Sequence, residues 1–467
     1  MGQIYLLLTI VFLFLCVRKV LRGEIDNIFY TYFVTFLLGY FVPGILQCNA
    51  SRLGYNSILD PTWKGLAMIV LFFIFYELGT RVKFRIGGRY TTNNEFDYYI
   101  PNEEIFVKKL ANFIIVFSLA FFLIYCSFYG GVFTVMKNIS NIRYGSLAIS
   151  NAKVGFISKL YYCVTLAPVL LAGYWNKKGK ISRTNIVIAF LAAGLITVST
   201  GSRGSLGLLL LNFLIPPFCE RFIKWTNSAQ MLISTKKFRK VMKVGILALL
   251  VFFFVSVLYR PIIGFTQVWA SSGFSNAIDN ITEELGGSRN RYSVASGKDI
   301  LYSLYLSFRH PIVSLEKAIQ MVDSGMHKKN YFLEFYIMLQ SVIPSKLLGV
   351  TKLDGIVDYN SRYLEGPYHG NVPPGIVGSA YYSGGILWVI FYGLLFGYLS
   401  KKLDNVNSKL IKHTTFGRYY QIFSIFLFQN VFMGGDFDDG FKNMFTKIIF
   451  MGVLASHFKK VPKAAVS

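Results

Sequence analysis

The residues best suited to chemistry in this chain are arginines that stand beside long apolar runs. In TVSTGSRGSLGLLLL, at 197–211, Arg203 is flanked by glycines and hydroxyls, with apolar runs on both sides. Arg260 ends another such run in VLYRPIIGF. A guanidinium group keeps its charge at physiological pH and matches phosphate or carboxylate with two parallel N–H bonds. We therefore expect these arginines to bind an oxyanion.

Arg203 also stands where the chain has to turn. The apolar stretch 185–218 is too long for one ordinary membrane span, and Gly201, Ser202 and Gly204 favour a turn. We predict a hairpin turn at Ser202–Gly204, followed by a helix whose first N–H groups support anion binding beside Arg203. The alternative left open is that Arg203 only anchors the chain to lipid phosphates.

The composition indicates that these arginines lie in a membrane protein. The chain has 467 residues, of which 54% are hydrophobic and only 15% are charged, so it is too apolar for one or two soluble domains. About eleven runs approach the length that a helix needs to cross a bilayer. We predict spans near 3–17, 28–46, 62–79, 111–129, 158–174, 184–200, 204–219, 243–262, 375–398, 416–433 and 442–457.

The net charge of +25 follows the alternation of these spans. Lysine and arginine concentrate in one set of connections, which the positive-inside rule places in the cytoplasm. That set comprises 18–27, 80–110, 174–183, 219–243, 399–418 and the C-terminal tail. We therefore expect the N-terminus outside and the C-terminus inside, and we interpret the basic excess as an orientation signal in preference to a nucleic-acid surface.

The predicted spans divide the chain into three parts: an N-terminal bundle at 1–262, a long outward loop at 263–374, and closing spans at 375–467. Apolar, helix-compatible stretches at 299–322 and 331–344 suit helices that lie at the membrane interface or cap a cavity. We therefore expect the loop to be a lid or part of a site. The absence of an internal repeat in the sequence counts against a transporter.

Other candidate residues fall on the same predicted outer face. Arg143 lies in NIRYGSL, and Arg289 and Arg291 lie in GGSRNRYS. Arginine on that face usually has a partner or a task, and together these side chains predict a cationic site for a lipid-linked phosphate or pyrophosphate. For Arg260, capping of a helix or pairing with a glutamate of ITEELGG stays an equal alternative.

His369 is the candidate proton acceptor, in GPYHGNVPPGIVG just before a predicted span. Histidine takes up a proton near neutral pH, and the Pro-Pro pair that follows favours an extended entry to the helix. An incidental surface histidine is the alternative. The five cysteines form no disulfide or zinc pattern, and no phosphate loop of the Walker type is present. We expect neither a metal nor a cofactor, and interpret Asp436–Asp439 as a solvated acidic turn.

The chain resembles the Wzy-type polymerases, which join lipid-linked oligosaccharide repeat units into O-antigen or capsular polysaccharide. The resemblance rests on the arrangement of about eleven spans with one large outward loop, and on short motifs. These motifs are the SRG turn at Ser202–Gly204, IPSKLLGVTK at 343–352 and GSAYYSGGILWVIFYG at 378–393. Related ligases carry a His-Asn motif in the corresponding loop, whereas this chain has His369-Gly370-Asn371, which leaves the identity of the base open.

The resemblance implies an all-α polytopic membrane protein with a bundle like that of GT-C glycosyltransferases, in the bacterial cytoplasmic membrane. It implies glycosyl transfer at the outer face, with undecaprenyl-pyrophosphate-linked oligosaccharide as donor and acceptor, and a chain-length regulator as a possible partner. Arg203 and Arg260 would stabilise the leaving pyrophosphate. Arg143, Arg289 and Arg291 would hold lipid pyrophosphate, His369 would act on the acceptor hydroxyl, and Tyr368, Tyr381 and Tyr382 would contact sugars.

Three alternatives to a polymerase stay open. A ligase that moves finished polysaccharide onto lipid A core would share nearly all of these features. A flippase for the same lipid-linked repeat would be expected to place its cations near the membrane midplane and to have shorter outward loops. A membrane scaffold without activity is disfavoured by the clustered arginines. For each tyrosine, packing in a protein core is at least as plausible as contact with a sugar.

Overall fold

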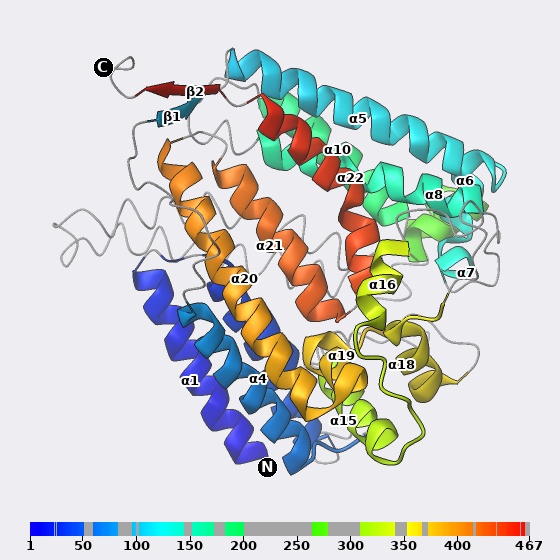
Figure 1. Ribbon diagram of the computed structural model, residues 1–467. Coiled ribbons are helices and arrows are strands. Elements are labelled where there is room, and N and C mark those ends of the chain that lie inside the picture. The colour runs from blue at the N-terminus through cyan, green and yellow to red at the C-terminus, as the bar shows by residue number, and fades with distance from the viewer. Residues whose placement is uncertain are drawn as a thin grey trace, which may run out of the picture.

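The computed structural model is a helical bundle with one short β-ribbon (Figure 1). The structure describes residues 1–22, 24, 26–50, 59–82, 96–99, 102–143, 152–171, 183–199, 264–278, 309–340, 353–366, 372–413, 417–435, 437–457 and 459–462. The ribbon pairs β1 (Phe96–Tyr99) antiparallel with β2 (Lys459–Pro462). The expectation of a mainly helical chain is confirmed, and the ribbon is an addition that the sequence analysis did not anticipate.

Five of the described helical segments are long and apolar enough to cross a membrane: Gly2–Val20, Asn27–Cys48, Trp63–Arg81, Glu103–Ser127 and Ile386–Ser408. Three shorter apolar helices occupy Phe156–Leu171, Thr184–Ser199 and Met444–Ser456. All eight overlap spans predicted from the sequence. The predicted spans at 204–219 and 243–262 lie outside the described residues, so the total of about eleven stays a prediction.

The first layer of the bundle consists of α1 (Gly2–Leu21), α4 (Trp63–Arg81) and α20 (Ile386–His413), which run side by side in Figure 1. The chain from α1 to α4 forms α2 (Asn27–Tyr30), the π-helix η1 (Thr31–Phe41) and α3 (Val42–Cys48). Most of η1 is buried. Aromatic side chains fill this core, with Phe36, Phe72 and Tyr76 in mutual ring contact.

A second group of helices packs around its own apolar core. It contains α5 (Glu103–Ser127), α8 (Ala152–Tyr161), the 3-10 helix η3 (Tyr162–Thr165), α10 (Arg183–Ser199) and α22 (Phe437–Ser456). The short helices α6 (Val132–Lys137) and α7 (Ile139–Arg143) follow α5. Helix α21 (Gly417–Gly434) packs against both α20 and α22 and so joins the two groups.

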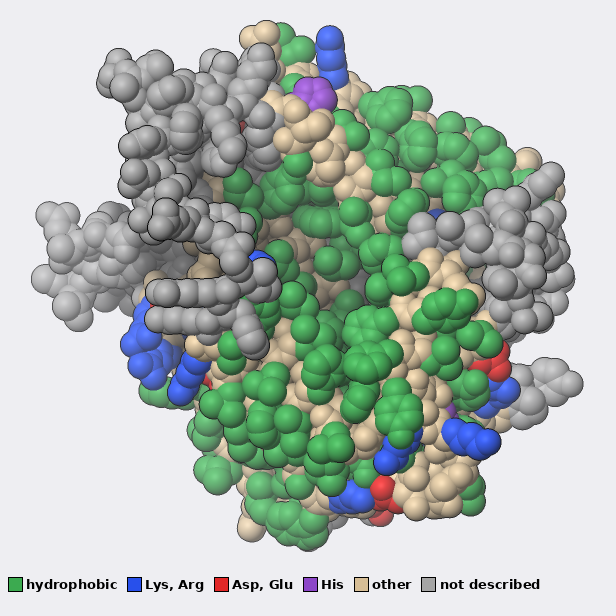
Figure 2. Space-filling view, in the orientation of Figure 1, with side chains coloured by type: hydrophobic (Ala, Val, Ile, Leu, Met, Phe, Trp, Pro, Cys, Tyr) green, Lys and Arg blue, Asp and Glu red, His purple; other side chains and the backbone are tan. Residues whose placement is uncertain are grey.

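Apolar side chains cover much of the described part of the face shown in Figure 2. On α1 they include Leu7, Ile10 and Phe14, which are 61%, 56% and 65% exposed. On α5, Phe113 and Val116 are similarly exposed. Contiguous apolar surface of this extent is rare on soluble proteins. Together with the long apolar helices, it indicates a membrane-embedded protein.

Helices α4 and α20 approach closely because glycines line their contact. A Cβ atom at Gly397 of α20 would lie 2.0 Å from the carbonyl oxygen of Tyr76, and one at Gly79 of α4 would lie 2.3 Å from that of Leu394. Gly393 and Gly397 form a GxxxG pattern, which allows backbones to pack together inside a membrane. The absence of side chains at these positions therefore sets the distance between the two helices.

The predicted outward loop, whose described part at 264–278 contacts α6 through Trp269 and Phe133, also contributes described helices that fold against one end of the bundle. They include α15 (His310–Asp323), α16 (Leu333–Gln340) and α18 (Ile356–Glu365). The described parts of the two apolar stretches are largely helical, as predicted, whereas 299–308 and 341–344 lie outside the described residues. Helix α15 is packed more deeply than an interfacial helix. It belongs to the main apolar core, where Ile312, Leu315 and Ala318 are fully buried. Core packing, and not membrane contact, explains its apolar residues.

The span predicted at 375–398 is broken in two. Helix α19 (Gly375–Gly384) ends at a Gly-Gly pair, and α20 begins immediately after it. Gly385 has a φ of 70°, a left-handed conformation that glycine adopts without steric cost. All ten residues of α19 are buried, mainly against α15. The sequence stays hydrophobic across this break, so it predicted one span. The structure has a short buried helix followed by a longer one.

Two ends of the first layer matter for the candidate sites. The α15 end contains the N-terminus, the start of α4, and α15, α18 and α19, at the bottom of Figure 1. The α2 end contains the end of α1, the short helix α2 and the part of α20 around Asp404. The sequence analysis assigned the segments of the α15 end to one side of the membrane, and their proximity agrees with that assignment.

We predict that Gly397→Ala destabilises the protein by about 1–3 kcal/mol, because the new methyl group overlaps the Tyr76 carbonyl and separates α4 from α20. Thermal unfolding of the purified protein in detergent measures the effect. Gly452→Ala in α22 is the matched control, since a Cβ atom there meets nothing within 4 Å. Equal unfolding temperatures for Gly397→Ala and the wild type would contradict the close packing.

Candidate functional site

Most site residues predicted from the sequence lie outside the described residues. These are Arg203, Arg260, Arg289, Arg291, Tyr368 and His369. Arg143 is the last residue of α7, and its side chain is likewise outside the described part. Tyr381 and Tyr382 of α19 are described. The roles assigned to all nine residues stay predictions, but the surroundings of the two tyrosines form a polar site at the α15 end.

A buried carboxylate attaches α15 to the start of α4. The Glu316 side chain accepts hydrogen bonds from the backbone N–H of Thr62 at 2.9 Å and from its hydroxyl at 2.7 Å. The same hydroxyl accepts from the N–H of Gly65 at 3.0 Å and so caps α4. A negative group is favoured at a helix N-terminus. Burial raises the pKa of Glu316, although the hydrogen bonds from Thr62 act in the opposite direction.

Gly65 makes this attachment possible. A Cβ atom at that position would lie 1.9 Å from Glu316 Oε1. Glu316 itself is 5% exposed, so its carboxylate occupies the space that a side chain at Gly65 would need. The contact therefore depends on both residues, which are far apart in the sequence.

Beside this attachment, Lys64, Asp323 and Tyr381 form a second polar group, called here the Lys64 cluster. The Lys64 ammonium pairs with Asp323, and Tyr381 Oη donates a 2.7 Å hydrogen bond to Asp323 Oδ1. The Lys64 ammonium also lies 5.7 Å from the centre of the Tyr381 ring. Burial alone would raise the pKa of Asp323, but the hydrogen bonds from Lys64 and Tyr381 outweigh it and lower that pKa. The carboxylate therefore stays ionised at neutral pH.

The Lys64 cluster is open to solvent on one side. The side chains of Lys64 and Asp323 are 43% and 42% exposed, whereas Tyr381 is 2% exposed. A buried ring thus supports an exposed cation and an exposed carboxylate. The Lys64 ammonium can donate hydrogen bonds to the hydroxyl groups of a polyhydroxylated ligand, and the Asp323 carboxylate can accept hydrogen bonds from them.

Tyr382 belongs to a buried hydrogen-bond network that reaches the end of the segment containing His369. Its hydroxyl donates to Asn360 Oδ1 at 3.1 Å. Asn360 Nδ2 donates to Ser314 Oγ at 2.9 Å and to the carbonyl of Val372 at 2.8 Å. The N–H of Val372 donates to Ser361 Oγ at 2.8 Å. Both backbone groups of Val372, three residues after His369, are therefore fixed to α18.

His327 lies in an aromatic cage next to this network. Its ring centre is 5.3 Å from that of Tyr359 and 4.9 Å from that of Tyr382, and its Nδ1 is 3.2 Å from Tyr363 Oη. The other ring nitrogen, Nε2, is buried and has no hydrogen-bond partner within the described part of the chain. Burial lowers the pKa of His327, so the imidazole is neutral at pH 7.

The sequence analysis missed the residues that organise the α15 end. Glu316, Asp323 and His327 lie in the predicted outward loop, where charged residues are ordinarily solvated, and Lys64 begins a predicted span. The available signal was Glu316 within the apolar stretch HPIVSLEKAIQMV, because an acid on the buried face of a helix needs a partner. The identity of that partner, Thr62, depends on tertiary structure.

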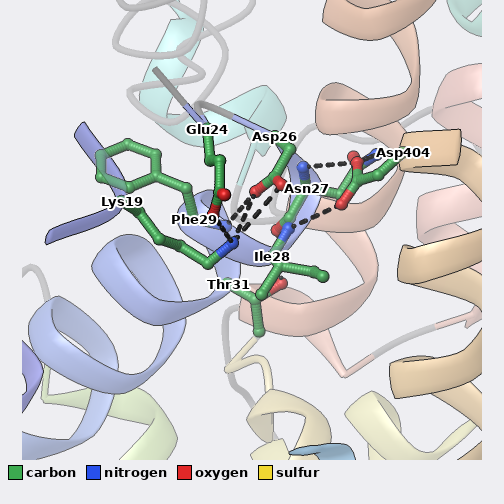
Figure 3. Close-up of polar contacts among 8 residues, drawn as sticks. All are labelled: Lys19, Glu24, Asp26, Asn27, Ile28, Phe29, Thr31 and Asp404. Carbon is green, nitrogen blue, oxygen red and sulfur yellow. Dashed lines mark hydrogen bonds and ion pairs between the residues drawn. The ribbon is translucent and has the colours of Figure 1, made fainter. Parts of the chain in front are cut away.

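A different polar cluster occupies the α2 end, and Figure 3 shows its members converging from α1, α2 and α20. Asp26 caps α2 by accepting from the N–H of Phe29 at 2.8 Å, and Lys19 lies 3.4 Å from its carboxylate. Burial raises the pKa of Asp26, against the attraction of Lys19. Asp404 of α20 accepts from the N–H and side-chain amide of Asn27 at 2.8 and 2.7 Å.

The comparisons with known proteins add no assignment to these sites. No family model, no curated protein and no solved structure matches the chain.

We predict that His327 makes the protein less stable as the pH falls below about 6.5, the ordinary pKa of histidine. The pKa is lowered on folding, so between the folded and unfolded values the unfolded chain binds more protons. Stability from this residue is full above the unfolded pKa and is lost as the pH falls toward the folded one. Thermal unfolding between pH 7.5 and 5 measures the effect.

The variant His327→Gln should show a shallower fall in unfolding temperature over this pH range. His457→Gln, at an exposed histidine after α22, serves as the control and should keep the wild-type slope. Identical slopes for the wild type and His327→Gln would show that the buried imidazole is not the titrating group.

Proposed function

We propose that the chain polymerises undecaprenyl-pyrophosphate-linked oligosaccharide repeat units into O-antigen or capsular polysaccharide. The growing chain on its lipid carrier is the donor, and a sugar hydroxyl of a new lipid-linked repeat is the acceptor. The protein acts in the bacterial cytoplasmic membrane, with its site at the outer face. The observation that carries this proposal is the set of arginines beside apolar runs, in a chain that resembles Wzy-type polymerases.

The structure of the α15 end supports the proposal, because this end could hold the acceptor sugar. It gathers two described helices of the long loop, α15 and α18, and long loops in compact proteins are often functional. The Lys64 cluster presents one cation and one carboxylate to solvent. In the proposal, these two groups bind sugar hydroxyls of the acceptor. The network through Asn360 holds Val372 and so fixes the chain that follows His369.

The proposed chemistry needs charge stabilisation at the departing group. Glycosyl transfer passes through an oxocarbenium-like state while negative charge develops on the leaving pyrophosphate. Arg203 and Arg260 stabilise that charge, and Arg143, Arg289 and Arg291 hold lipid pyrophosphate. His369 accepts the proton of the attacking hydroxyl or orients it. Tyr381 and Tyr382 are 2% and 0% exposed. Because both rings are buried, they position the neighbouring polar groups and do not present a ring face on which a sugar could stack.

We predict that deletion of this protein, in cells whose surface polysaccharide depends on it, leaves lipid A core carrying a single repeat unit. Complementation with Arg203→Ala should leave the same product or reduce polymerisation by on the order of 100-fold, because a fixed charge at the leaving group is lost. Gel ladders of the surface polysaccharide measure both, at matched membrane levels of protein. Arg18→Ala is the control, because Arg18 is exposed and lies near the C-terminal end of α1, away from the α15 end.

Other outcomes assign other functions. Bare core, with polymer accumulating on the carrier lipid, would identify a ligase. Bare core, with single repeats accumulating on the inner leaflet, would identify a flippase. A full ladder with Arg203→Ala would reduce that arginine to a membrane anchor and remove it from the proposed site.

A further inference from the structure

An exposed apolar surface lies on α16 and on the turn that precedes it. Tyr331 and Phe332 of the turn are 52% and 56% exposed, and Tyr336 and Leu339 of α16 are 51% and 63% exposed. Phe332, Tyr336 and Leu339 are four and three residues apart, so they lie on one side of the helix. These four side chains are called here the α16 face. A contiguous apolar surface of this kind marks a site that binds a membrane or another molecule.

The other side of α16 is fixed to the bundle. Glu334 and Ile337 are 0% and 3% exposed. The ring of Phe335 stacks on that of Phe437, at the start of α22, with centres 5.1 Å apart. The helix therefore packs on the protein with one side and turns the α16 face outward. Packing within the described chain does not explain why this outward side is apolar.

The α16 face continues the outer surface of a membrane span. The rings of Tyr331 and Phe332 lie 5.4 and 5.2 Å from that of Trp388. Trp388 is in the first turn of the segment Ile386–Ser408, which is long and apolar enough to cross a membrane. Its neighbour Leu387 is 71% exposed, and an apolar side chain exposed on a span faces lipid. The α16 face therefore lies at the edge of a lipid-facing surface.

Two lysines border the α16 face. Lys328 and Lys329 precede Tyr331 and are both exposed. A Cβ atom at Gly385 would lie 3.9 Å from Lys329 Nζ, so this ammonium lies beside the start of α20. In Figure 2, lysine and arginine side chains border the apolar area toward the α15 end. Lysines at the end of a span reach lipid phosphates, and tyrosine and tryptophan are enriched at the same depth.

The backbone of Tyr331 is strained. Its φ is 49°, in the left-handed region that a bulky residue rarely adopts. Its N–H donates a 2.6 Å hydrogen bond to the carbonyl of Ser383, which fixes the turn to α19. Since the ring is half exposed, burial in the protein core does not explain the strain. Contact with lipid gives the outward position of the ring a purpose.

We propose that the α16 face inserts into the bilayer surface at the α15 end, and that Lys328 and Lys329 bind the phosphates of anionic phospholipids. The order of charged, aromatic and aliphatic side chains matches the passage from headgroups to acyl chains. Lipid is the partner because the surface continues that of α20 and is bordered by two cations. The contact fixes the depth of α16 and, through Ser383, that of α19. This inference does not depend on the proposed function.

The first test places a bimane fluorophore at Leu339→Cys in the full-length protein, in phosphatidylcholine nanodiscs. We expect quenching by phospholipids brominated in the acyl chains and little quenching by iodide in the water. Leu7→Cys, on the exposed side of α1, gives the value for a lipid-facing site. Glu365→Cys, exposed at the end of α18, should show the reverse pattern. Labelled wild type gives the background from native cysteines.

The second test measures thermal unfolding in nanodiscs of phosphatidylcholine with increasing phosphatidylglycerol. A ligand that binds only the folded state raises the unfolding temperature, so the wild type should become more stable. In Lys328→Gln/Lys329→Gln the apparent affinity for phosphatidylglycerol should fall by about fivefold for each lysine lost. Lys328→Arg/Lys329→Arg is the matched control, because it keeps both charges and should keep the response.

Three results would overturn the proposal. Quenching of the Leu339 probe by iodide, and not by brominated lipid, would place the α16 face in water. Quenching by neither would show that protein covers it, either a second copy of this chain or another part of the same chain. An equal response to phosphatidylglycerol in the wild type and the double glutamine variant would show that these lysines do not bind the headgroups.

Discussion

The contact of the Glu316 carboxylate with the start of α4 positions the remaining parts of the α15 end. It attaches α15 to the start of a helix 254 residues earlier in the chain, at 2.9 and 2.7 Å from the two donors of Thr62. With α15 fixed, its last residue, Asp323, meets Lys64 and Tyr381, and its buried face packs against α19. Ser314 then reaches Asn360, which holds α18 and Val372. Loss of the Glu316 contact would therefore loosen the whole site.

The α2 end uses the same physical device with a different helix. Asp404 from α20 accepts hydrogen bonds from the first N–H groups of α2. Glu316 accepts from the N–H and the hydroxyl of Thr62, the residue that caps α4. In both cases an acid from a distant segment satisfies donors that a helix cannot pair by itself. The two ends differ in what remains unsatisfied. The Glu316 carboxylate accepts from both donors of Thr62, whereas Asn27 Oδ1 at the α2 end has no hydrogen-bond partner among the described residues.

The sequence predicted the helical class, the positions of most described spans and the helices of the long segment, because hydrophobic runs and their lengths reflect burial directly. It did not predict the break at Gly384–Gly385, since two glycines barely change the hydrophobicity of their window. Nor did it predict that α15 would be a core helix, because burial in protein and in lipid select the same side chains. Glu316, Asp323 and Asp404 acquire their roles from partners distant in sequence, which hydrophobic periodicity does not reveal.

The most direct measurement of the central claim uses the purified protein in proteoliposomes with lipid-linked repeat units as the only substrate. Chain length is followed by mass spectrometry of the lipid-linked products. The account predicts chains of two or more repeats and release of undecaprenyl pyrophosphate, with neither nucleotide sugar nor lipid A core present. Single repeats that remain unjoined, in protein shown to be folded by its unfolding transition, would contradict it.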